Sequence, residues 1–508
     1  MASYWSSLRR SLTRIPLRSG RLARCLAHSL ARCLAHSLAL RRGISAAVAL
    51  AFGISLLPQP ALLPFVDPDR LSGQAWAQQR RGGVSLVRDA EIEATIRAYA
   101  SPLLGAAGIG SESVQVYLVN ERSLNAFVAG GQRIFVHTGL LQRAERPAQV
   151  IGVLAHEIGH IAGGHLARLE DSLGQASAIM IASMLLGAAA AVASGSGEAA
   201  MAGVLAGQQV ATRNLLSFTR AQESAADQAG ANFLEQTQQS ARGLAEFMNI
   251  LANQEALVVE RQDPYVRTHP LSAERVSALN ARVEQSRYGN KPDTPENIER
   301  FNRMQAKLMG YLDGLPATLR KYPASDTSRF ARYARAFAYF RALDFAKALE
   351  QVDSLLAEFP NDQYFHELKG DILLDMGRIN DAVADHRRAY ELAPNEPLLA
   401  YGFARAQIAL DDPALLPEAT RSLQEVTRRE PENVGAWQQL AVAYGRAGDI
   451  GMASLASAER FLASGELRDA QGQAERAKRL LKEGSPGWLR AQDVIDAATD
   501  RRRELRNR

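Results

Sequence analysis

The pattern of apolar and polar positions changes along the chain from a mixed type to a helical one. Residues 87–107 repeat their apolar positions at helical spacing, which predicts a first helix. Residues 113–119, SVQVYLV, alternate apolar and polar side chains as a half-buried strand does, and a second strand is predicted at 133–136. From about Pro147 to the C-terminus helical periodicity dominates. We therefore expect a mainly α-helical protein with a small β-sheet.

A 34-residue period runs through the C-terminal half. Ala348 and Ala382 are 34 positions apart, and so are Pro360 and Pro394. Further residues fit the small-residue, aromatic and turn positions of a tetratricopeptide repeat, with a short insertion near 411–419: Gly370, Ala389, Trp437, Leu440, Tyr444 and Ala453. Each unit of this kind is a helical hairpin that buries its apolar face against its neighbours. We expect an α-helical tetratricopeptide solenoid with a concave binding surface, and an ordinary helical bundle is the alternative.

One long stretch carries no charge. Residues 172–197 hold no Asp, Glu, Lys or Arg, and 176–193 are nearly continuous Ala, Ile, Met, Leu and Val. The length is close to the roughly 20 residues that a bilayer span needs. However, alanine is only weakly hydrophobic, and residues 201–209 are too short and glycine-broken to cross back. We favour an apolar helical hairpin over 176–210, either buried or in contact with a membrane surface, over a true span.

Composition also marks domain boundaries. Residues 286–297, SRYGNKPDTPEN, are rich in proline, aspartate and asparagine, as a boundary segment often is. The expected organisation is a leader (1–77), a first domain that includes the apolar hairpin (78–285), a linker with a helix (286–320), the repeat domain (321–500) and a basic tail (501–508).

The net charge of +5 belongs to the leader. Residues 1–77 hold ten arginines against Asp67 and Asp69, so 49 basic and 52 acidic residues remain from position 78 onward. This balance gives no support to nucleic-acid binding. The leader reads as an export signal, with Arg41-Arg42, an apolar run at 43–57 and a cleavage site after Ala77. A start codon placed too far upstream would explain its length, and a retained membrane anchor is the alternative.

Both cysteines, Cys25 and Cys33, lie in the leader. A chain cleaved after Ala77 therefore has no thiol, which removes cysteine nucleophiles and cysteine metal ligands from consideration.

The segment LAHEIGHIAGGH, residues 154–165, predicts a metal site. His156 and His160 are four positions apart and so share one face of a helix. Glu157 completes the pattern H-E-x-x-H, in which the carboxylate accepts a proton from the attacking water. Neutral imidazole suits zinc. We expect one Zn²⁺ per chain. The alternative is two unrelated surface histidines, but the motif is flanked by apolar residues, as expected of a helix that is buried on its other faces.

The third histidine of this segment is not expected to bind the metal. On a continuous helix His165 would point about 180° away from His156. The longer metzincin pattern would need a histidine at position 166, which is Leu166. A bend at Gly163-Gly164 could still bring His165 back. We expect a packing or hydrogen-bonding role.

A third ligand must therefore come from elsewhere. Glu223 and Asp227 lie four positions apart in FTRAQESAADQAG, among small residues that permit close helix packing. Glu223 would complete a His2Glu site, and Asp227 could hydrogen-bond a histidine ligand. A solvated acidic helix face is the alternative.

Four segments together resemble the M48 family of zinc metallopeptidases: HEIGH (156–160), ESAAD (223–227), NAFVAGGQRIFVHTGLL (125–141) and THPLSAER (268–275). The likeness covers residues 85–500 and is weakest in the repeats. It implies a zincin-like α+β metallopeptidase domain followed by the solenoid, with Glu223 as the third zinc ligand. With its leader and repeats, the chain is similar to periplasmic members of that family that assist outer-membrane β-barrel assembly.

The resemblance also implies roles for other residues. Gly130 and Gly131 would precede a strand whose free edge binds an extended substrate, and Asn125 would help to place the scissile bond. His269 and Arg275 would be polar residues near zinc. His269 either stabilises the oxyanion or occupies the fourth zinc position and holds the enzyme latent. A loop histidine without such a role is the alternative.

These observations lead to one functional hypothesis and two alternatives. We expect an exported, periplasmic zinc endopeptidase that degrades unfolded or misassembled envelope proteins and reaches the outer-membrane assembly machinery through its repeats. The first alternative is a scaffold or chaperone with a latent peptidase. The second is a membrane-anchored M48 peptidase, held by 43–57 and 176–193.

Overall fold

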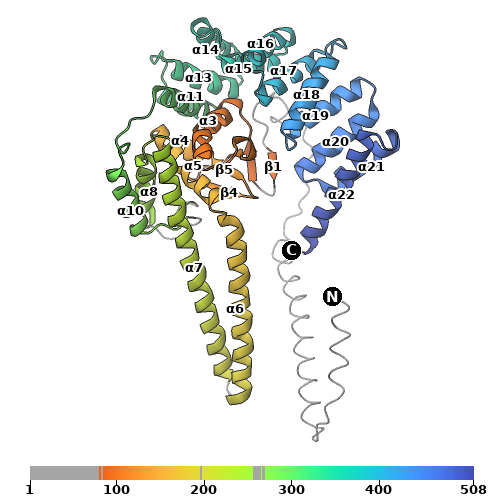
Figure 1. Cartoon of the computed structure of the whole chain (residues 1–508). Coiled ribbons are helices and arrows are strands. Elements are labelled where there is room, and N and C mark those ends of the chain that lie inside the picture. The colour runs from red at the N-terminus through yellow and green to blue at the C-terminus, as the bar shows by residue number, and fades with distance from the viewer. Residues whose placement is uncertain (1–78, 82–83, 195–196, 256–264, 266–268, 508) are drawn as a thin grey trace, which may run out of the picture. The chain divides into compact units, whose positions relative to one another are not determined.

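The computed structural model describes residues 79–81, 84–194, 197–255, 265 and 269–507 (Figure 1). The predicted leader, its cleavage site and both cysteines lie outside these residues. Contacts among the described residues join the N-terminal part and the repeats into one compact unit. The predicted domain boundaries therefore remain predictions.

A five-stranded mixed sheet lies near the start of the described chain. Its order is β1-β2-β3-β5-β4, with β1 (Gln79–Arg81), β2 (Val84–Val87), β3 (Gln115–Val119), β4 (Ala126–Ala129) and β5 (Arg133–His137). β3 and β5 pair in parallel, and the other neighbours pair in antiparallel fashion. The strands predicted at 113–119 and 133–136 are confirmed as β3 and β5. Leu118, Ile134 and Val136 are fully buried in the core.

The sheet corrects one expectation about its free edge. The strand that follows Gly130 and Gly131 is β5, and it lies between β3 and β4. The edge strand is β4, which precedes the glycine pair. Both glycines have positive φ, +58° and +95°, so they turn the chain back and fold β4 onto the outside of β5. The pairing is fixed by turn geometry, which the period of apolar residues does not encode.

Seven helices of the described chain contribute to the larger core beside the sheet. They are α3 (Ala90–Ala106), α4 (Thr138–Arg143), α5 (Pro147–Ala162), α7 (Gly197–Gln236), α8 (Arg242–Glu255), α10 (Ala273–Gln285) and α11 (Pro295–Leu312). The helix predicted at 87–107 is confirmed as α3, and its start is fixed by Asp89, whose side chain accepts a hydrogen bond from the Ile92 N–H. α11 lies in the predicted linker, but its Phe301 and Met304 are buried in this core.

Two long helices form a hairpin that extends away from the sheet (Figure 1). α6 (His165–Ser194) and α7 (Gly197–Gln236) pack on each other along their length. The predicted buried arrangement is wrong for the described apolar side chains of α6, because Ile181, Leu185 and Leu186 are 60%, 68% and 71% exposed. None of the helices among the described residues is long and apolar enough to cross a membrane.

The repeat half is an array of antiparallel helix pairs. After α12 (Leu315–Lys321) come α13 (Arg329–Arg341), α14 (Phe345–Glu358), α15 (Gln363–Asp375), α16 (Ile379–Leu392), α17 (Pro397–Leu410), α18 (Leu416–Arg429), α19 (Val434–Arg446), α20 (Ile450–Ser464), α21 (Leu467–Leu480) and α22 (Pro486–Asn507). α13, α15 and α17 begin 34 residues apart. The predicted solenoid is confirmed, and the predicted insertion lies between α17 and α18.

Small residues set the spacing of these helices. A Cβ atom on Gly370 would lie 2.7 Å from the ring of His386, a distance that real Cβ contacts do not show. The glycine predicted at a repeat position is therefore needed for the close approach of α15 and α16.

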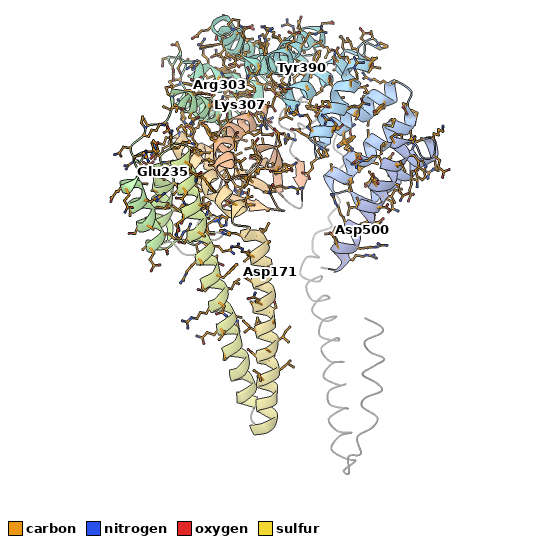
Figure 2. The ribbon with its side chains drawn as sticks, in the orientation of Figure 1. Asp171, Glu235, Arg303, Lys307, Tyr390 and Asp500 are labelled. Atoms are coloured by element: carbon orange, nitrogen blue, oxygen red, sulfur yellow. The ribbon has the colours of Figure 1, made fainter. Side chains whose placement is uncertain are left out.

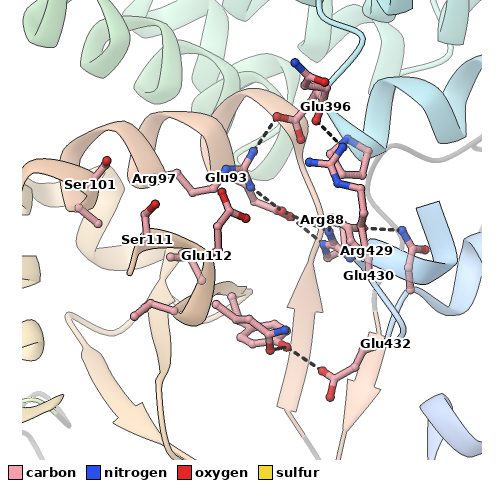
Figure 3. Close-up of a pocket in the computed structure, with 18 of the residues that line it drawn as sticks. Arg88, Glu93, Arg97, Ser101, Ser111, Glu112, Glu396, Arg429, Glu430 and Glu432 are labelled. Carbon is pink, nitrogen blue, oxygen red and sulfur yellow. Dashed lines mark hydrogen bonds and ion pairs between the residues drawn. The ribbon is translucent and has the colours of Figure 1, made fainter. Parts of the chain in front are cut away.

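Buried ion pairs connect the N-terminal part to the repeats. Arg303 of α11 binds Asp362 at the start of α15. Lys307 of the same helix binds Asp89 at the start of α3, within the N-terminal part, with Nζ and Oδ2 2.7 Å apart. Figure 2 labels Arg303 and Lys307. A second junction lines a cavity of about 570 Å³, where Arg88 pairs with Glu430 and Arg97 with Glu396 (Figure 3). Because both members of several pairs are largely buried, these contacts fix the junction.

Candidate metal centre

Helix α5 places the first two predicted ligands. Its apolar side chains pack into the core on several faces, and the helix is buried from Pro147 to Gly159. His156 and Glu157 are fully buried, and His160 is slightly exposed. The rings of His156 and His160 meet edge to face with centroids 4.7 Å apart, and their Nε2 atoms are 3.0 Å apart. Both Nε2 atoms therefore face one point.

Helix α7 brings Glu223 to the same point. A Cβ atom on Gly159 would lie 2.6 Å from the carbonyl oxygen of Ala226, so α5 and α7 approach each other so closely that only glycine fits at this position. The carboxylate of Glu223 lies 3.4 Å from Nε2 of His156 and 3.4 Å from Nε2 of His160. The structure therefore brings together the two histidines and the carboxylate that the sequence singled out.

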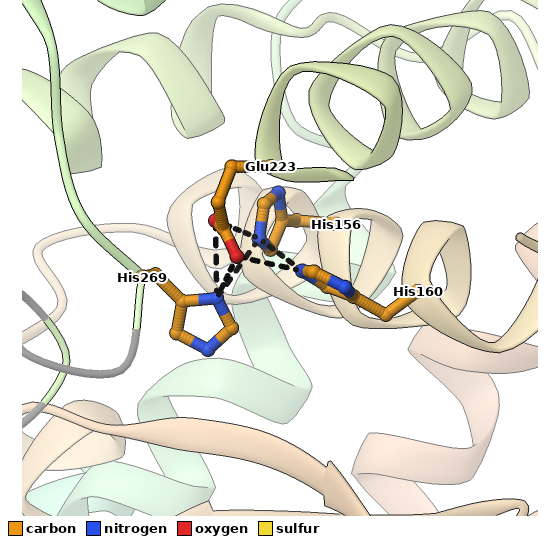
Figure 4. Close-up of side chains that lie close together, drawn as sticks. All are labelled: His156, His160, Glu223 and His269. Atoms are coloured by element: carbon orange, nitrogen blue, oxygen red, sulfur yellow. Dashed lines mark hydrogen bonds and ion pairs between the residues drawn. The ribbon is translucent and has the colours of Figure 1, made fainter. Parts of the chain in front are cut away.

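A third imidazole joins this cluster from the segment before α10. Nδ1 of His269 lies 3.2 Å from both oxygens of Glu223 and 3.3 Å from Nε2 of His156 (Figure 4). One ligand atom from each of His156, His160, Glu223 and His269 falls within 4.8 Å of the others. Three imidazoles and one carboxylate fit a transition-metal cation of the zinc type.

Asp227 and Arg275 contact the proposed ligands on the side away from the point where the ligand atoms meet. Oδ1 of Asp227 lies 2.8 Å from Nδ1 of His156, the nitrogen that points away from the cluster. Arg275 donates from Nε to Asp227 over 2.6 Å, and its Nη1 lies 3.1 Å from Glu223. Arg275 also donates to the backbone oxygen of Pro270, one residue after His269. This one guanidinium therefore links α7 to the segment of His269, and Asp227 extends the link to His156 of α5.

The charges of the cluster follow from burial and pairing. Burial lowers the pKa of His160 to about 2. Burial would also lower the pKa of His156, but hydrogen bonds to Asp227 and Glu223 outweigh it and raise the pKa to about 10. Burial would raise the pKa of Glu223, but hydrogen bonds from His156 and His269 outweigh it and hold the pKa well below its usual value. Asp227 is also ionised, because His156 and Arg275 outweigh its burial and lower its pKa.

Glu157 differs from the other carboxylates. Neither of its oxygens makes a hydrogen bond with another side chain among the described residues, and Oε1 lies 3.5 Å from Nε2 of His269. Burial raises the pKa of Glu157. A buried carboxyl group with a raised pKa can accept and release a proton near neutral pH.

A cavity of about 630 Å³ opens beside these groups. Its lining includes Glu157, His160, Glu223 and His269, together with Phe127 and Val128 of β4, Gly131, and Leu166, Leu169 and Thr219 at the base of the α6–α7 hairpin. The free edge strand and the cluster therefore share one cavity. Asn125 is buried just before β4, and neither Asn125 nor Gly130 is in the lining.

Two neighbours of the cluster were not assigned to the site from the sequence. The ring of Tyr265 stacks on His269 with centroids 4.4 Å apart, and no motif signalled this residue. His165 is buried, and its Nδ1 lies 2.9 Å from Nδ1 of His160. The glycine pair at 163 and 164 was the available signal, because α5 ends there and Gly164 adopts φ +60°.

Comparison with known proteins gives four findings. Residues 87–283 match the model of peptidase family M48. The chain is 27% identical over 474 residues to the beta-barrel assembly-enhancing protease of Yersinia pestis, covering 89% of this chain and 94% of that one. It is 28% identical over 447 residues to the protein of the same name from Escherichia coli K12, covering 86% and 88%. Against the crystal structure of MamA the TM-score is 0.26 at 19% identity, over 34% of this chain and 97% of that chain.

The family match covers strands β3, β5 and β4 of the sheet, the H-E-x-x-H helix α5, the Glu223 helix α7 and the segment of His269 and Arg275. The match to peptidase family M48 over residues 87–283, together with the cluster of His156, His160, Glu223 and His269, supports a metallopeptidase.

Proposed function

We propose that this metallopeptidase is a zinc endopeptidase that cleaves unfolded or misassembled envelope proteins. The observation that carries the proposal is the convergence of His156, His160 and Glu223 in a buried cluster beside a cavity that also borders a free strand edge. We propose these three side chains as the zinc ligands, with one Zn²⁺ per chain.

Zinc, when bound, supplies a Lewis acid that polarises the scissile carbonyl group and makes water nucleophilic at neutral pH. Glu157 accepts the proton of the attacking water on a carboxylate oxygen and then delivers it to the leaving amine. Its burial, its raised pKa and its place in the cavity lining support this role. Asp227 fixes the ring of His156 so that Nε2 faces the cluster.

The position of His269 supports the predicted role in which it occupies the fourth zinc position and holds the enzyme latent. Its Nδ1 lies among the ligand atoms, which suits a fourth ligand that excludes substrate while it stays in place. Arg275 is then a positioning residue, because it binds Asp227 and Glu223 and anchors the backbone beside His269.

Strand β4 supports a preference for extended substrates. Edge strands present unpaired backbone groups that can pair with an added strand. Phe127 and Val128 of β4 line the same cavity as Glu157, so a peptide paired with β4 passes close to the ligands. Gly131 of the turn borders this path. Unfolded proteins offer such segments, whereas folded proteins do not.

The relatives and the repeats support a place in envelope quality control. Two relatives that cover most of this chain are named for enhancing β-barrel assembly. We propose that the solenoid binds the outer-membrane assembly machinery or its client proteins, because stacked helix pairs form a concave binding surface. The predicted export signal would deliver the chain to the periplasm.

We also propose that the α6–α7 hairpin contacts a membrane surface. Its exposed apolar side chains come from both helices: Leu173, Met180, Ile181, Met184, Leu185, Leu186, Leu205, Val210 and Leu216. Exposed Arg213 lies close in sequence to Leu216 on α7, and Asp171 lies near the start of α6 (Figure 2). Flotation of the full chain with vesicles of anionic lipid should be lost in Leu185→Asn/Leu186→Asn and kept in Leu489→Asn, which changes an equally apolar exposed residue on α22.

The peptidase proposal is tested with Glu157→Gln. The variant should bind one zinc per chain as the wild type does, yet leave unfolded casein uncut, because the amide cannot take up the proton. Arg122→Gln, on an exposed side chain, is the matched control. Casein cleavage by Glu157→Gln at the wild-type rate would falsify the role of Glu157. Full complementation of a deletion strain by the same variant would favour the scaffold alternative.

A further inference from the structure

In the part of the chain that the structure describes, His165 contacts the cluster through His160. The two Nδ1 atoms are 2.9 Å apart, and the rings meet edge to face with centroids 4.9 Å apart. His165 contributes no atom to the four-residue cluster. Its side chain is nevertheless buried, although it is the first residue of a helix that is mostly exposed further along.

The end of α5 is shaped to admit this imidazole. A Cβ atom on Gly163 would lie 2.2 Å from Nε2 and 2.5 Å from Cδ2 of His165, so any larger residue would displace the ring. Gly164 then takes φ +60°, which turns the chain and starts α6 at His165. The glycine pair therefore reverses the direction that a continuous helix would give His165.

We infer that His165 is a positioning residue that holds His160 in the tautomer required of a zinc ligand. This inference rests on the proposed zinc site. When Nε2 of His160 faces the metal, Nδ1 of His160 carries the proton and must donate it to an acceptor. The acceptor within reach is Nδ1 of His165, whose own proton is then on Nε2. Asp227 accepts the corresponding hydrogen bond from Nδ1 of His156. Each imidazole of the H-E-x-x-H pair therefore has its own hydrogen-bond partner on the side away from the cluster.

The first test compares His165→Asn with His165→Ala in the full chain, by zinc competition with a chromogenic chelator. Asparagine keeps an acceptor, since its Oδ1 is bonded to Cγ as Nδ1 is in histidine. Alanine removes the acceptor and should weaken zinc binding by about 10- to 100-fold, the range typical of lost outer partners. His165→Asn should restore most of the affinity. Equal affinities of the two variants would overturn the inference.

The second test uses Gly163→Ala, which displaces the ring without removing it. This variant should lose zinc affinity in the wild-type background and lose nothing further in His165→Ala, because both changes break one interaction. Gly174→Ala is the control, since its Cβ would meet no atom within 4 Å. Additive losses would overturn the inference. A wild-type chain that binds no zinc removes the proposed function as well, whereas zinc binding that is indifferent to position 165 removes the inference alone.

Discussion

The close approach of α5 and α7 at Gly159 makes a quantitative prediction about the metal site. In Gly159→Ala the new Cβ would lie 2.6 Å from the carbonyl oxygen of Ala226, and ordinary contact begins at 3.4 Å. The two helices must therefore separate by about 0.8 Å, the difference of these distances. α5 carries His156 and His160 and α7 carries Glu223, so the separation falls between the ligands. Zinc sites tolerate deviations of only about 0.2 Å in ligand distance.

Gly159→Ala should therefore weaken zinc binding at least tenfold, or about 1.4 kcal/mol. The metal-free fold should lose about 0–2 kcal/mol of stability, because overpacking costs about 1–3 kcal/mol and the higher helix propensity of alanine offsets about 1 kcal/mol. The assay is thermal unfolding with saturating zinc and with a chelator, because a bound ligand stabilises the folded state by mass action. The zinc-dependent rise in melting temperature should shrink in the variant.

The matched control is Gly105→Ala in helix α3, where a Cβ would meet no atom within 4 Å. This variant should keep the full zinc-dependent rise. If Gly159→Ala also kept it, α5 and α7 would not set the ligand distances, and the reasoning would be refuted.

Two further predictions concern the buried junctions. Lys307→Met leaves the buried carboxylate of Asp89 without the ammonium group that lies 2.7 Å from it. Urea unfolding at pH 7 should show a loss of about 3–5 kcal/mol. The control Lys347→Met, at an exposed ion pair, should leave the free energy of unfolding unchanged. Burial and the negative charge of Glu93 outweigh the positive charge of Arg97 and raise the pKa of Glu396 to about 7. Between about pH 4.5 and pH 7 the folded state therefore holds a proton that the unfolded state releases. The free energy of unfolding should fall by on the order of 3 kcal/mol as the pH rises through this range. Glu396→Gln should reduce this dependence of stability on pH, whereas Glu112→Gln, on an exposed residue of the same cavity, should leave it unchanged. Parallel curves of stability against pH for the wild type and Glu396→Gln would contradict the raised pKa of Glu396.

The parts of the fold that the sequence predicts are those set by local periodicity. The 34-residue period predicts the solenoid because each helix pair depends mainly on its neighbours. The spacing of His156 and His160 predicts a shared face because one helix carries both. The distant carboxylate was a candidate from its spacing to Asp227, and only the family resemblance singled out Glu223 strongly.

The missed features depend on contacts between distant segments or on backbone turns. The order of β4 and β5 follows from positive φ at Gly130 and Gly131, which periodicity does not register. The hydrogen-bonding role expected of His165 is confirmed by its contact with His160, and the turn at Gly164 brings the two rings together. The place of Tyr265 against His269, and the ion pair between Lys307 and Asp89, join residues that no local pattern relates.

Helix α7 connects the exposed apolar surface to the proposed metal site. It runs without interruption from Gly197 to Gln236, and it carries both the exposed Val210 and the buried Glu223. These two residues are 13 positions apart, which corresponds to about 20 Å along a helix. A continuous helix transmits changes in orientation along its length, so whatever holds the hairpin also restrains the carboxylate that faces His156 and His160. Because Ala226, one turn beyond Glu223, packs against Gly159 with no room for a Cβ atom, a shift of α7 cannot be absorbed at that contact and must move Glu223 relative to the two histidines.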